Sequence, residues 1–404
     1  MGKNIVLCLD GTWNGPNALD KTGNLTPTNV QKLFEALKGS APLAAADQEK
    51  EVVWPATAGA TVRQAAKYIH GIGDTDNALA RACEGATGLG LVARVVRGYT
   101  YLSRVYAPGD RLFIVGFSRG AYTARALAGL VVRQGLLDWK AMQLVAGSQT
   151  SYSAGLAAWQ LYKTATYQND GNILHQLAKV VTDLHDRLDL ELHPAPKLQY
   201  VGGVGVAALG VWDTVGALGI PYIVEQDKSP VRLDVFQFCD TVLNAHVASG
   251  FHAVAVDEQR VDFTPTLWDA RDGVVQVLFP GAHSDVGGGN PVAESGLSDG
   301  PLIWMARQLA SAGVLLEAVP TGTVDAIPVQ HQPWSGGDVP YKTGARTFPP
   351  GLRLSQRVLQ RAAAASVLVE RGPAPATAYR PRNIVDSYVL KDWTGAAPKV
   401  QVES

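Results

Sequence analysis

The chain has 404 residues, a formal net charge of −1 and 47% hydrophobic residues. This apolar content is ample for a buried core, and the near-zero charge gives no case for nucleic-acid binding or for strong attraction to anionic lipid. Three cysteines form no disulfide framework, which indicates folding in a reducing compartment. No apolar run approaches the roughly 20 residues of a membrane-spanning helix, and the N-terminus lacks a signal-peptide pattern. We therefore expect a protein made in the cytoplasm, whose export would need a dedicated secretion system.

The first predicted strand is the apolar run at 4–9, and Asp10 and Gly11 follow it. A glycine directly after a strand can present its backbone N–H without a side chain in the way. We therefore expect Gly11 to supply one donor of an oxyanion hole and Asp10 to support its loop. Asp10-Gly11-Thr12 also resembles part of the phosphatase motif D-x-D-G-T. Cys8 stands where that motif has its nucleophilic aspartate, so the phosphatase interpretation loses its central residue.

A serine follows a second apolar run. Residues 111–115 precede Gly116-Phe117-Ser118-Arg119-Gly120, and the segment at 121–128 is typical of a helix. This is the sequence G-x-S-x-G in a strand–turn–helix context, where the tight turn needs small flanking residues and lifts the hydroxyl clear of the sheet. We expect Ser118 to be a nucleophile, Gly116 and Gly120 to permit the turn, and the Arg119 N–H to be the second oxyanion donor.

Residues 136–196 are predicted to form a helical insertion between the predicted nucleophile, Ser118, and a later candidate acid, Asp213. Apolar residues recur at helical spacing at 157–162 and again at 173–190. Two interpretations stay open. The helices either cap a pocket and supply its apolar walls, or they cover a face of the sheet.

Two later strands end on residues that could complete a catalytic triad. The apolar run at 206–212 ends on Asp213, and the run at 274–279 leads into a turn that carries His283 among small residues. A serine hydroxyl needs a base, and the base needs an acid that orients it. We expect His283 and Asp213 in these roles, because active sites of open α/β sheets lie at the carboxyl ends of strands. Asp213 as a helix N-cap and His252 as the base are the alternatives.

Other motifs give weaker signals. Residues 203–208 fit G-x-G-x-x-A, but they run into an apolar strand and not into a helix, so we expect no dinucleotide site. No C-x-x-C or H-E-x-x-H pattern occurs, and we expect neither a metal nor a cofactor. Asp285 beside His283 is expected to support the turn by a hydrogen bond.

The C-terminal part is less regular. Residues 320–350 are rich in Pro, Gly and Thr and are predicted to be an irregular loop, while 351–371 suggest a helix. We expect one α/β domain over 1–404, with a mostly parallel sheet flanked by helices and an irregular region at 320–404 packed on the core.

Several short motifs occur one after another along nearly the whole chain. They are Leu9 to Asn14, Pro108 to Asp110, Gly116 to Arg125, Gly210 to Gly219, His252-Ala253 with Asp257-Glu258, Pro280 to Gly289, Ser366-Val367, Arg371 and Tyr379 to Asn383. This set resembles a bacterial and fungal α/β-hydrolase family, long catalogued as a domain of unknown function. The family includes type VI secretion phospholipase effectors of the first lipase-effector class. The resemblance implies Ser118, Asp213 and His283 as the triad.

The resemblance and the residues together predict a serine carboxylic-ester hydrolase of the phospholipase A or lipase/esterase type that works through an acyl-enzyme. The resemblance further implies a lipid or acyl-ester substrate, peripheral membrane contact, and a secretion-machine or immunity-protein partner. One alternative is an esterase or deacetylase of small or non-lipid substrates. Another is a binding or scaffold protein with a hydrolase fold, which would not need the three polar residues.

Overall fold

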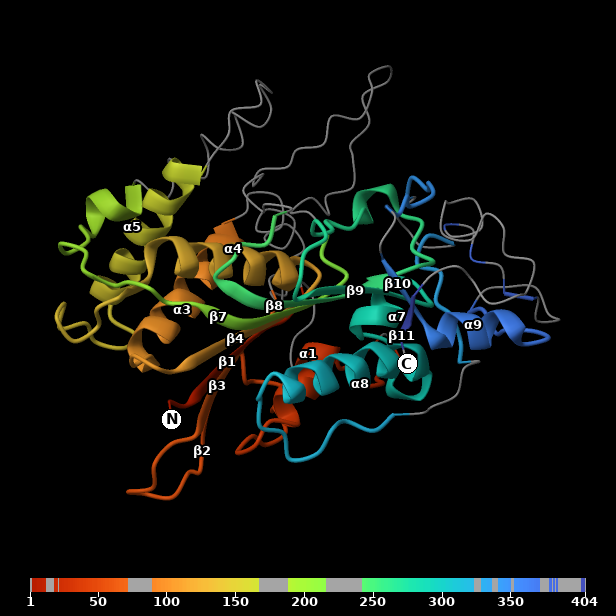
Figure 1. The fold of residues 1–404 in the computed structure, drawn as a ribbon, viewed down its shortest axis with the longest axis horizontal. Helices are drawn as coiled ribbons and strands as arrows, with labels where there is room; N and C mark the ends of the chain where they lie inside the picture. The colour runs from red at the N-terminus through yellow and green to blue at the C-terminus, as the bar shows by residue number, and fades with distance from the viewer. Residues whose placement is uncertain are drawn as a thin grey trace, which may run out of the picture.

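A nine-stranded, mostly parallel sheet forms the centre of the molecule (Figure 1). The computed structural model describes residues 2–11, 18–20, 22–71, 89–166, 188–215, 242–322, 328–335, 341–349, 352–370, 378–379, 381, 383 and 401–403. The strands of the sheet are β1 (Asn4–Leu9), β2 (Glu49–Trp54), β3 (Gln64–Ile69), β4 (Arg111–Phe117), β7 (Val206–Trp212), β8 (Val247–Ala255), β9 (Val274–Phe279), β10 (Arg353–Ser355) and β11 (Val402–Glu403). Their order is β11-β10-β9-β8-β7-β4-β1-β3-β2, and β2 alone among these strands runs antiparallel to its neighbour.

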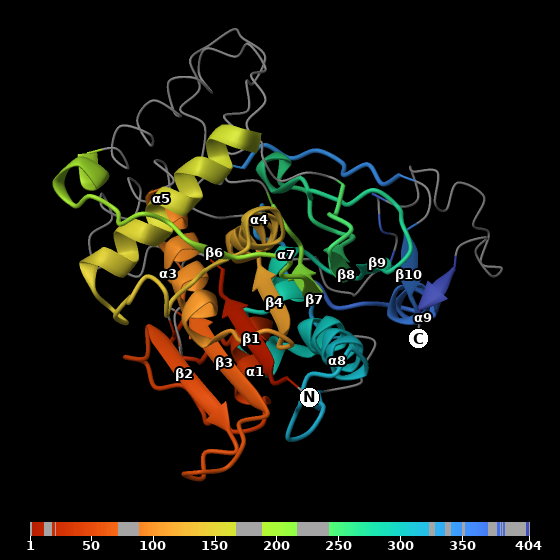
Figure 2. The ribbon, with the colours of Figure 1, turned by 60° about the vertical axis from the view of Figure 1, so that its left-hand side comes forward.

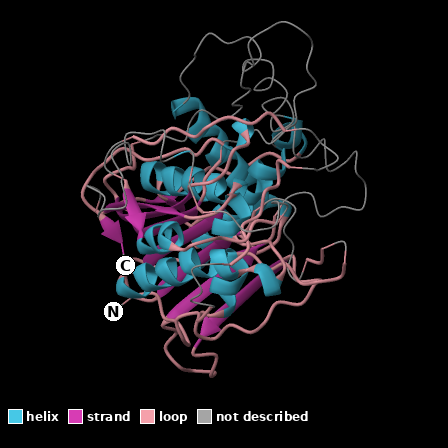
Figure 3. Cartoon of the chain, turned by 90° about the vertical axis from the view of Figure 1, so that its right-hand side faces the viewer, coloured by secondary structure: helices cyan, strands magenta, loops and turns pink. Residues whose placement is uncertain are grey.

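Helices cover both faces of this sheet, as Figures 2 and 3 show. They are α1 (Asn29–Glu35), α3 (Leu89–Val105), α4 (Arg119–Gln134), α5 (Gln149–Thr166), α7 (His283–Gly287), α8 (Gly296–Ser311) and α9 (Gln356–Ala363). The short helices η1 (Val261–Phe263) and η2 (Val292–Glu294) lie in loops. The expected α/β fold with a mostly parallel sheet between helices is confirmed.

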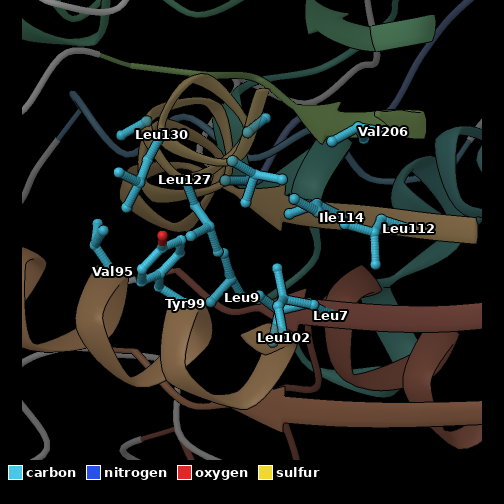
Figure 4. Close-up of a cluster of buried hydrophobic side chains, with 14 of the residues drawn as sticks. Leu7, Leu9, Val95, Tyr99, Leu102, Leu112, Ile114, Leu127, Leu130 and Val206 are labelled. Atoms are coloured by element: carbon cyan, nitrogen blue, oxygen red, sulfur yellow. The ribbon is translucent and has the colours of Figure 1, made fainter. Parts of the chain in front are cut away.

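Strand β1 shows how the sequence builds the two layers. Ile5, Leu7 and Leu9 pack against α3 and α4, whereas Val6 and Cys8 pack against α1 and α8. Successive side chains of a strand point to opposite faces, so a strand buried on both faces is apolar at every position. Figure 4 shows the first of these clusters, in which Leu7 and Leu9 meet side chains of α3 and α4.

The strand order reverses direction between β1 and β4. The chain passes from β1 to β3 on one side and then to β4 on the other side. Ligands of open α/β sheets bind at such a switch point, beyond the carboxyl ends of the strands. Asp10 and Gly11 follow β1 and Ser118 follows β4, so these residues lie at the switch point.

The described part of the 136–196 insertion lies over the helical layer. It contains α5 and the strand β5 (Leu136–Leu137), which pairs with β6 (Tyr200–Val201) as a separate antiparallel ribbon. Trp159 of α5 is fully buried in the cluster that α3 and α4 form. The helix therefore covers the layer beneath it, while the second predicted helix of the insertion, at 173–190, lies mostly outside the described residues.

The C-terminal region is more regular than its composition suggests. β10 and β11 extend the sheet beyond β9, and α9 follows β10 with the N-cap Ser355 accepting from Arg357 N–H. Around them, Phe348, Leu354 and Val358 form a third apolar cluster with Val254 and Leu278 of the sheet. The segments at 328–335 and 341–349 are irregular.

Candidate active site

Ser118 occupies a strained turn between β4 and α4. Its φ of 56° and ψ of −124° lie outside the regions that L-residues favour, and its backbone N–H donates to Trp212 O at 3.1 Å. Its side chain lies at the beginning of α4 and gives no capping bond to that helix. The residue is 8% exposed, so its surroundings largely exclude water. This is the geometry that the G-x-S-x-G pattern predicts.

The two flanking glycines allow the turn because side chains would collide there. A Cβ at Gly116 would lie 2.4 Å from the carbonyl oxygen of Gly120. A Cβ at Gly120 would lie 2.3 Å from the carbonyl oxygen of Leu9 and 2.4 Å from that of Asp10. The absence of a side chain at Gly120 thus lets the first turn of α4 approach the end of β1.

Asp213 and His283 meet across the ends of β7 and β9. His283 Nδ1 donates to Asp213 Oδ2 at 2.6 Å, and both side chains are buried. Asp213 has a φ of 36°, and its Oδ1 accepts from Ala255 N–H at 2.9 Å. Asp213 caps no described helix, and its carboxylate contacts His283 and the Ala255 N–H.

The imidazole of His283 is enclosed by aromatic rings. Phe117, which precedes Ser118, has its ring centroid 4.7 Å from that of His283, and Phe263 lies edge-on at 4.9 Å. The backbone N–H of His283 donates to Glu258 Oε2 at 3.1 Å. Burial lowers the pKa of His283, against the opposing effect of Asp213, so the ring is predominantly neutral near pH 7. A neutral imidazole beside the serine turn is suited to accept a proton.

Arg346 binds the far side of Asp213, and sequence reasoning missed it. Its Nη1 donates to Asp213 Oδ1 at 2.8 Å and its Nη2 to Oδ2 at 2.9 Å. Burial opposes ionisation of Asp213, but the Arg346 guanidinium and His283 outweigh it and hold the pKa of the carboxyl well below its usual range. Arg346 lies in an irregular segment without a motif, so no signal in the sequence pointed to it.

His252, the alternative base, has hydrogen-bond partners at both ring nitrogens. Its Nε2 accepts from Thr214 N–H at 3.1 Å, and its Nδ1 faces Gln276 Oε1 at 3.3 Å. The side chain is fully buried within β8, and burial, followed by the charge of Arg125, lowers its pKa to about 3. The ring therefore holds the backbone N–H of the residue next to Asp213.

The predicted oxyanion donors are the backbone N–H groups of Arg119 and Gly11. Arg119 is the first residue of α4, where the helix dipole favours negative charge. The Gly11 N–H donates to Oδ1 of Asp10 at 2.7 Å. The Oδ2 of Asp10 accepts from Tyr68 at 2.6 Å and from Thr28 at 2.8 Å. Burial raises the pKa of Asp10 to about 6, against these hydrogen bonds.

Asp285 supports the turn that carries His283, from the side away from Asp213. Its Oδ2 accepts from the backbone N–H of Ala282 at 2.9 Å and from that of His331 at 3.0 Å. The His331 ring donates from Nδ1 to Asp285 Oδ1 at 2.6 Å. Gly281, with a φ of 105°, leaves room for the Asp285 side chain, which a Cβ would meet at 2.3 Å.

No group of three or more His, Cys, Asp or Glu residues within the described ranges is arranged to hold a metal ion. The segment that fits G-x-G-x-x-A enters β7 directly and forms no helix. Among the same described residues, no helix combines the length and apolar character needed to cross a bilayer.

The chain has a strained serine turn and a hydrogen-bonded Asp–His pair at the ends of strands in a mostly parallel α/β sheet. We compared the chain with known protein families. The model of the family "T6SS, Phospholipase effector Tle1-like, catalytic domain" matches residues 3–308. Because this match covers more than half of the chain, the chain belongs to the type VI secretion Tle1-like phospholipase effector family.

The individual relatives have low sequence identity to this chain. An uncharacterized protein of Saccharomyces cerevisiae is 25% identical over 234 residues, which are 54% of this chain and 27% of the relative. The crystal structure of an uncharacterized protein from Pseudomonas aeruginosa has a TM-score of 0.39 and 17% identity, over 78% of this chain and 47% of that one. The Tle1 effector bound to the VgrG spike gives 0.31 and 17%, over 72% and 52%. The chain thus spans about a quarter of the yeast relative and about half of each solved structure.

Proposed function

We propose that this chain is a serine hydrolase that cleaves a carboxylic ester of phospholipids. The observation that supports the mechanism is the 2.6 Å hydrogen bond between Asp213 and His283, whose ring lies against Phe117 beside the Ser118 turn. The observation that supports the lipid substrate is membership of a family described as phospholipase effectors.

The reaction begins with attack of Ser118 Oγ on the ester carbonyl. His283 Nε2, the ring nitrogen that does not face Asp213, takes the hydroxyl proton and returns it to the leaving alcohol. Asp213 keeps the proton on Nδ1 and so fixes the tautomer that leaves Nε2 as the acceptor. Water, activated by the same imidazole, then releases the acid from the acyl-enzyme.

The oxyanion is held by the Arg119 N–H and by the Gly11 N–H. The Arg119 amide stands at the beginning of α4, where the helix dipole also favours negative charge. The Gly11 amide donates to Asp10, so in this proposal it turns toward the substrate oxygen when the substrate binds. A glycine has the backbone freedom to make this change.

The serine mechanism is tested with the variant Ser118→Ala and a fluorophosphonate probe. The probe labels only an activated serine, so wild type should be labelled and the variant should not. Ester hydrolysis by the variant should fall by a factor of about 10³ or more while the protein stays folded. Equal labelling of both proteins would remove Ser118 from the role.

The substrate is tested with p-nitrophenyl esters from acetate to palmitate and with phosphatidylethanolamine and phosphatidylglycerol vesicles. A pocket that buries an acyl chain gains roughly 0.8 kcal/mol per methylene, so kcat/KM should rise with chain length if this gain is realised in the transition state. A preference for acetate with intact vesicles would instead indicate a small-ester esterase or a deacetylase. No hydrolysis and no labelling would favour a binding protein.

Family membership also leads us to propose export by a secretion machine, with a component of that machine as partner. In the similar solved structure, the Tle1 effector is bound to the VgrG spike. The producing cell should release the chain only while its secretion sheath is intact. Release from cells without the sheath would refute this route.

A further inference from the structure

Arg346 joins the proposed acid–base pair from a segment that is distant in sequence. Its side chain is almost fully buried, and its backbone N–H donates to Asn383 Oδ1 at 3.0 Å. Besides the two bonds to Asp213, its Nη1 donates to Ala255 O at 2.8 Å and its Nη2 to Phe263 O. The guanidinium is therefore held in one orientation by β8 and by the segment that carries Phe263.

These contacts leave the Asp213 carboxylate a single arrangement. Oδ1 accepts from Ala255 N–H and from Arg346 Nη1, and Oδ2 accepts from Arg346 Nη2 and from His283 Nδ1. A paired fork of two N–H donors fixes the plane of a carboxylate as well as its position. Arg346 Nη2 occupies one acceptor position of Oδ2, and the other accepts from the His283 imidazole.

Arg346 also changes the charge that His283 experiences. In a triad without such an arginine, the aspartate charge stabilises the imidazolium that forms during catalysis. Here the positive charge of Arg346 lies beside that carboxylate. The other charged groups that face His283 are Glu258 and Arg260, which form an ion pair at 2.8 Å. Two cations therefore balance two anions around the neutral ring.

We propose that Arg346 is a positioning residue of the hydrolase reaction, which fixes Asp213 against His283 and cancels the aspartate charge so that His283 remains a proton acceptor in mildly acidic solution. This proposal rests on the proposed function, because it assigns His283 the role of base. Burial contributes most to the lowered pKa of His283. Arg260 contributes in the same direction, whereas Asp213 and Glu258 oppose the shift.

The experiment measures the rate of fluorophosphonate labelling of Ser118 against pH. Labelling requires a neutral base, so the rate falls on the acidic side as His283 becomes protonated. In wild type this acidic limb should lie below the ordinary imidazole pKa of about 6.5. In Arg346→Met the limb should move up by about one pH unit or more, as expected when a neighbouring cation is lost.

Two further variants separate charge from geometry. Arg346→Lys keeps the charge but cannot form the fork, so its limb should stay near that of wild type while its maximal rate falls about tenfold. Arg346→Gln, which can still donate to one carboxylate oxygen, replaces Arg346→Met if the latter does not fold, with the same upward shift expected. Arg361→Met is the matched control, because Arg361 is also buried but lies in the C-terminal cluster and donates to Pro328 O.

The outcomes are distinct. An upward shift in the uncharged variants, with no shift in Arg346→Lys or Arg361→Met, supports the proposal. A lower rate with an unmoved limb in every Arg346 variant would refute charge cancellation, and so would a wild-type limb at or above about 6.5. If wild type is not labelled at any pH, the proposed function fails instead.

Discussion

The two halves of the candidate site are held together in different ways. The serine half depends on residues close in sequence, since Gly116 and Gly120 flank Ser118 and let α4 touch the end of β1. The acid–base half depends on side chains far along the chain, above all Arg346 and Asn383. This comparison teaches that a short motif can report where a nucleophile lies, while the base that would serve it is positioned by contacts that no motif records.

The largest expected effect comes from the proposed base, His283. His283→Ala should lower labelling and hydrolysis by a factor of about 10³ or more, because no other described imidazole contacts Asp213. Fluorophosphonate labelling and thermal unfolding measure the two consequences separately.

His252→Ala is the matched control for that variant. It leaves the Thr214 N–H and Gln276 without the partner they have now, which should destabilise the fold by about 1–3 kcal/mol. Labelling of the folded fraction should stay within about tenfold of wild type. The reverse pattern, a folded but inactive His252→Ala and an active His283→Ala, would transfer the role of base to His252.

The next largest effect is expected in the serine turn, which residues close in sequence hold in place. Gly120→Ala places a Cβ against the carbonyl oxygens of Leu9 and Asp10, so α4 and β1 must move apart. We expect a loss of about 1–3 kcal/mol in stability and about 100-fold in labelling, since a shift of about 1 Å misplaces the serine. Gly202→Ala is the control, because a Cβ there meets nothing within 4 Å. Normal labelling of Gly120→Ala would show that the approach of α4 to β1 is not needed for reactivity.

A smaller effect tests the long-range half. Asn383 Nδ2 donates to Val256 O at 2.7 Å and to Glu258 O at 2.9 Å, and its Oδ1 accepts from Arg346 N–H. Asn383→Ala should lower stability by about 2 kcal/mol and labelling by about tenfold, because Arg346 is then less firmly held. Chemical denaturation and labelling rates check this against Asn24→Ala, whose side chain lies in an exposed loop. A loss of stability with unchanged labelling would separate Asn383 from the site.

The sequence was informative where a residue follows a buried strand. The carboxyl ends of parallel strands meet at one edge, so the positions of Ser118, Asp213 and His283 after apolar runs predict a shared site. The structure joins Asp213 and His283 by a hydrogen bond. Their catalytic roles stay predictions. Arg346 could not be found in this way, because it lies in an irregular segment 133 residues from Asp213. Periodicity and motif spacing carry no signal for a contact of that kind.

Two other features, the bonding of the Gly11 N–H and the strand β10, were not predicted from the sequence. Gly11 was expected to present its N–H to the substrate oxygen. The carboxylate of the preceding Asp10 accepts a hydrogen bond from this N–H, and residue types alone do not specify that side-chain orientation. The strand β10 has three residues and follows a Pro-rich segment, so its apolar pattern is too short to recognise. Pairing with β9 places it in the sheet.

The smallest effect on catalysis is expected at His331, which lies behind the turn of His283 and not beside Asp213. Its Nδ1 donates to Asp285 Oδ1 at 2.6 Å and its Nε2 to Glu294 Oε2 at 2.9 Å. Burial opposes its charge, but the two carboxylates outweigh burial and raise the pKa of His331 to about 9.

A histidine whose pKa is raised in the folded state stabilises the fold fully below its unfolded value of about 6.5, and that contribution is lost as pH rises through about 9. The free energy of unfolding of wild type should therefore exceed that of His331→Gln by the largest margin at about pH 6, and the margin should shrink by about 3 kcal/mol by about pH 10. Urea unfolding at several pH values measures the margin, and labelling near pH 7 should change by less than about threefold, since Asp285 still accepts from Ala282 N–H. A margin that is constant with pH would mean that His331 is neutral between the two carboxylates. A large loss of labelling would mean that this side of the turn, like the Arg346 side, positions His283.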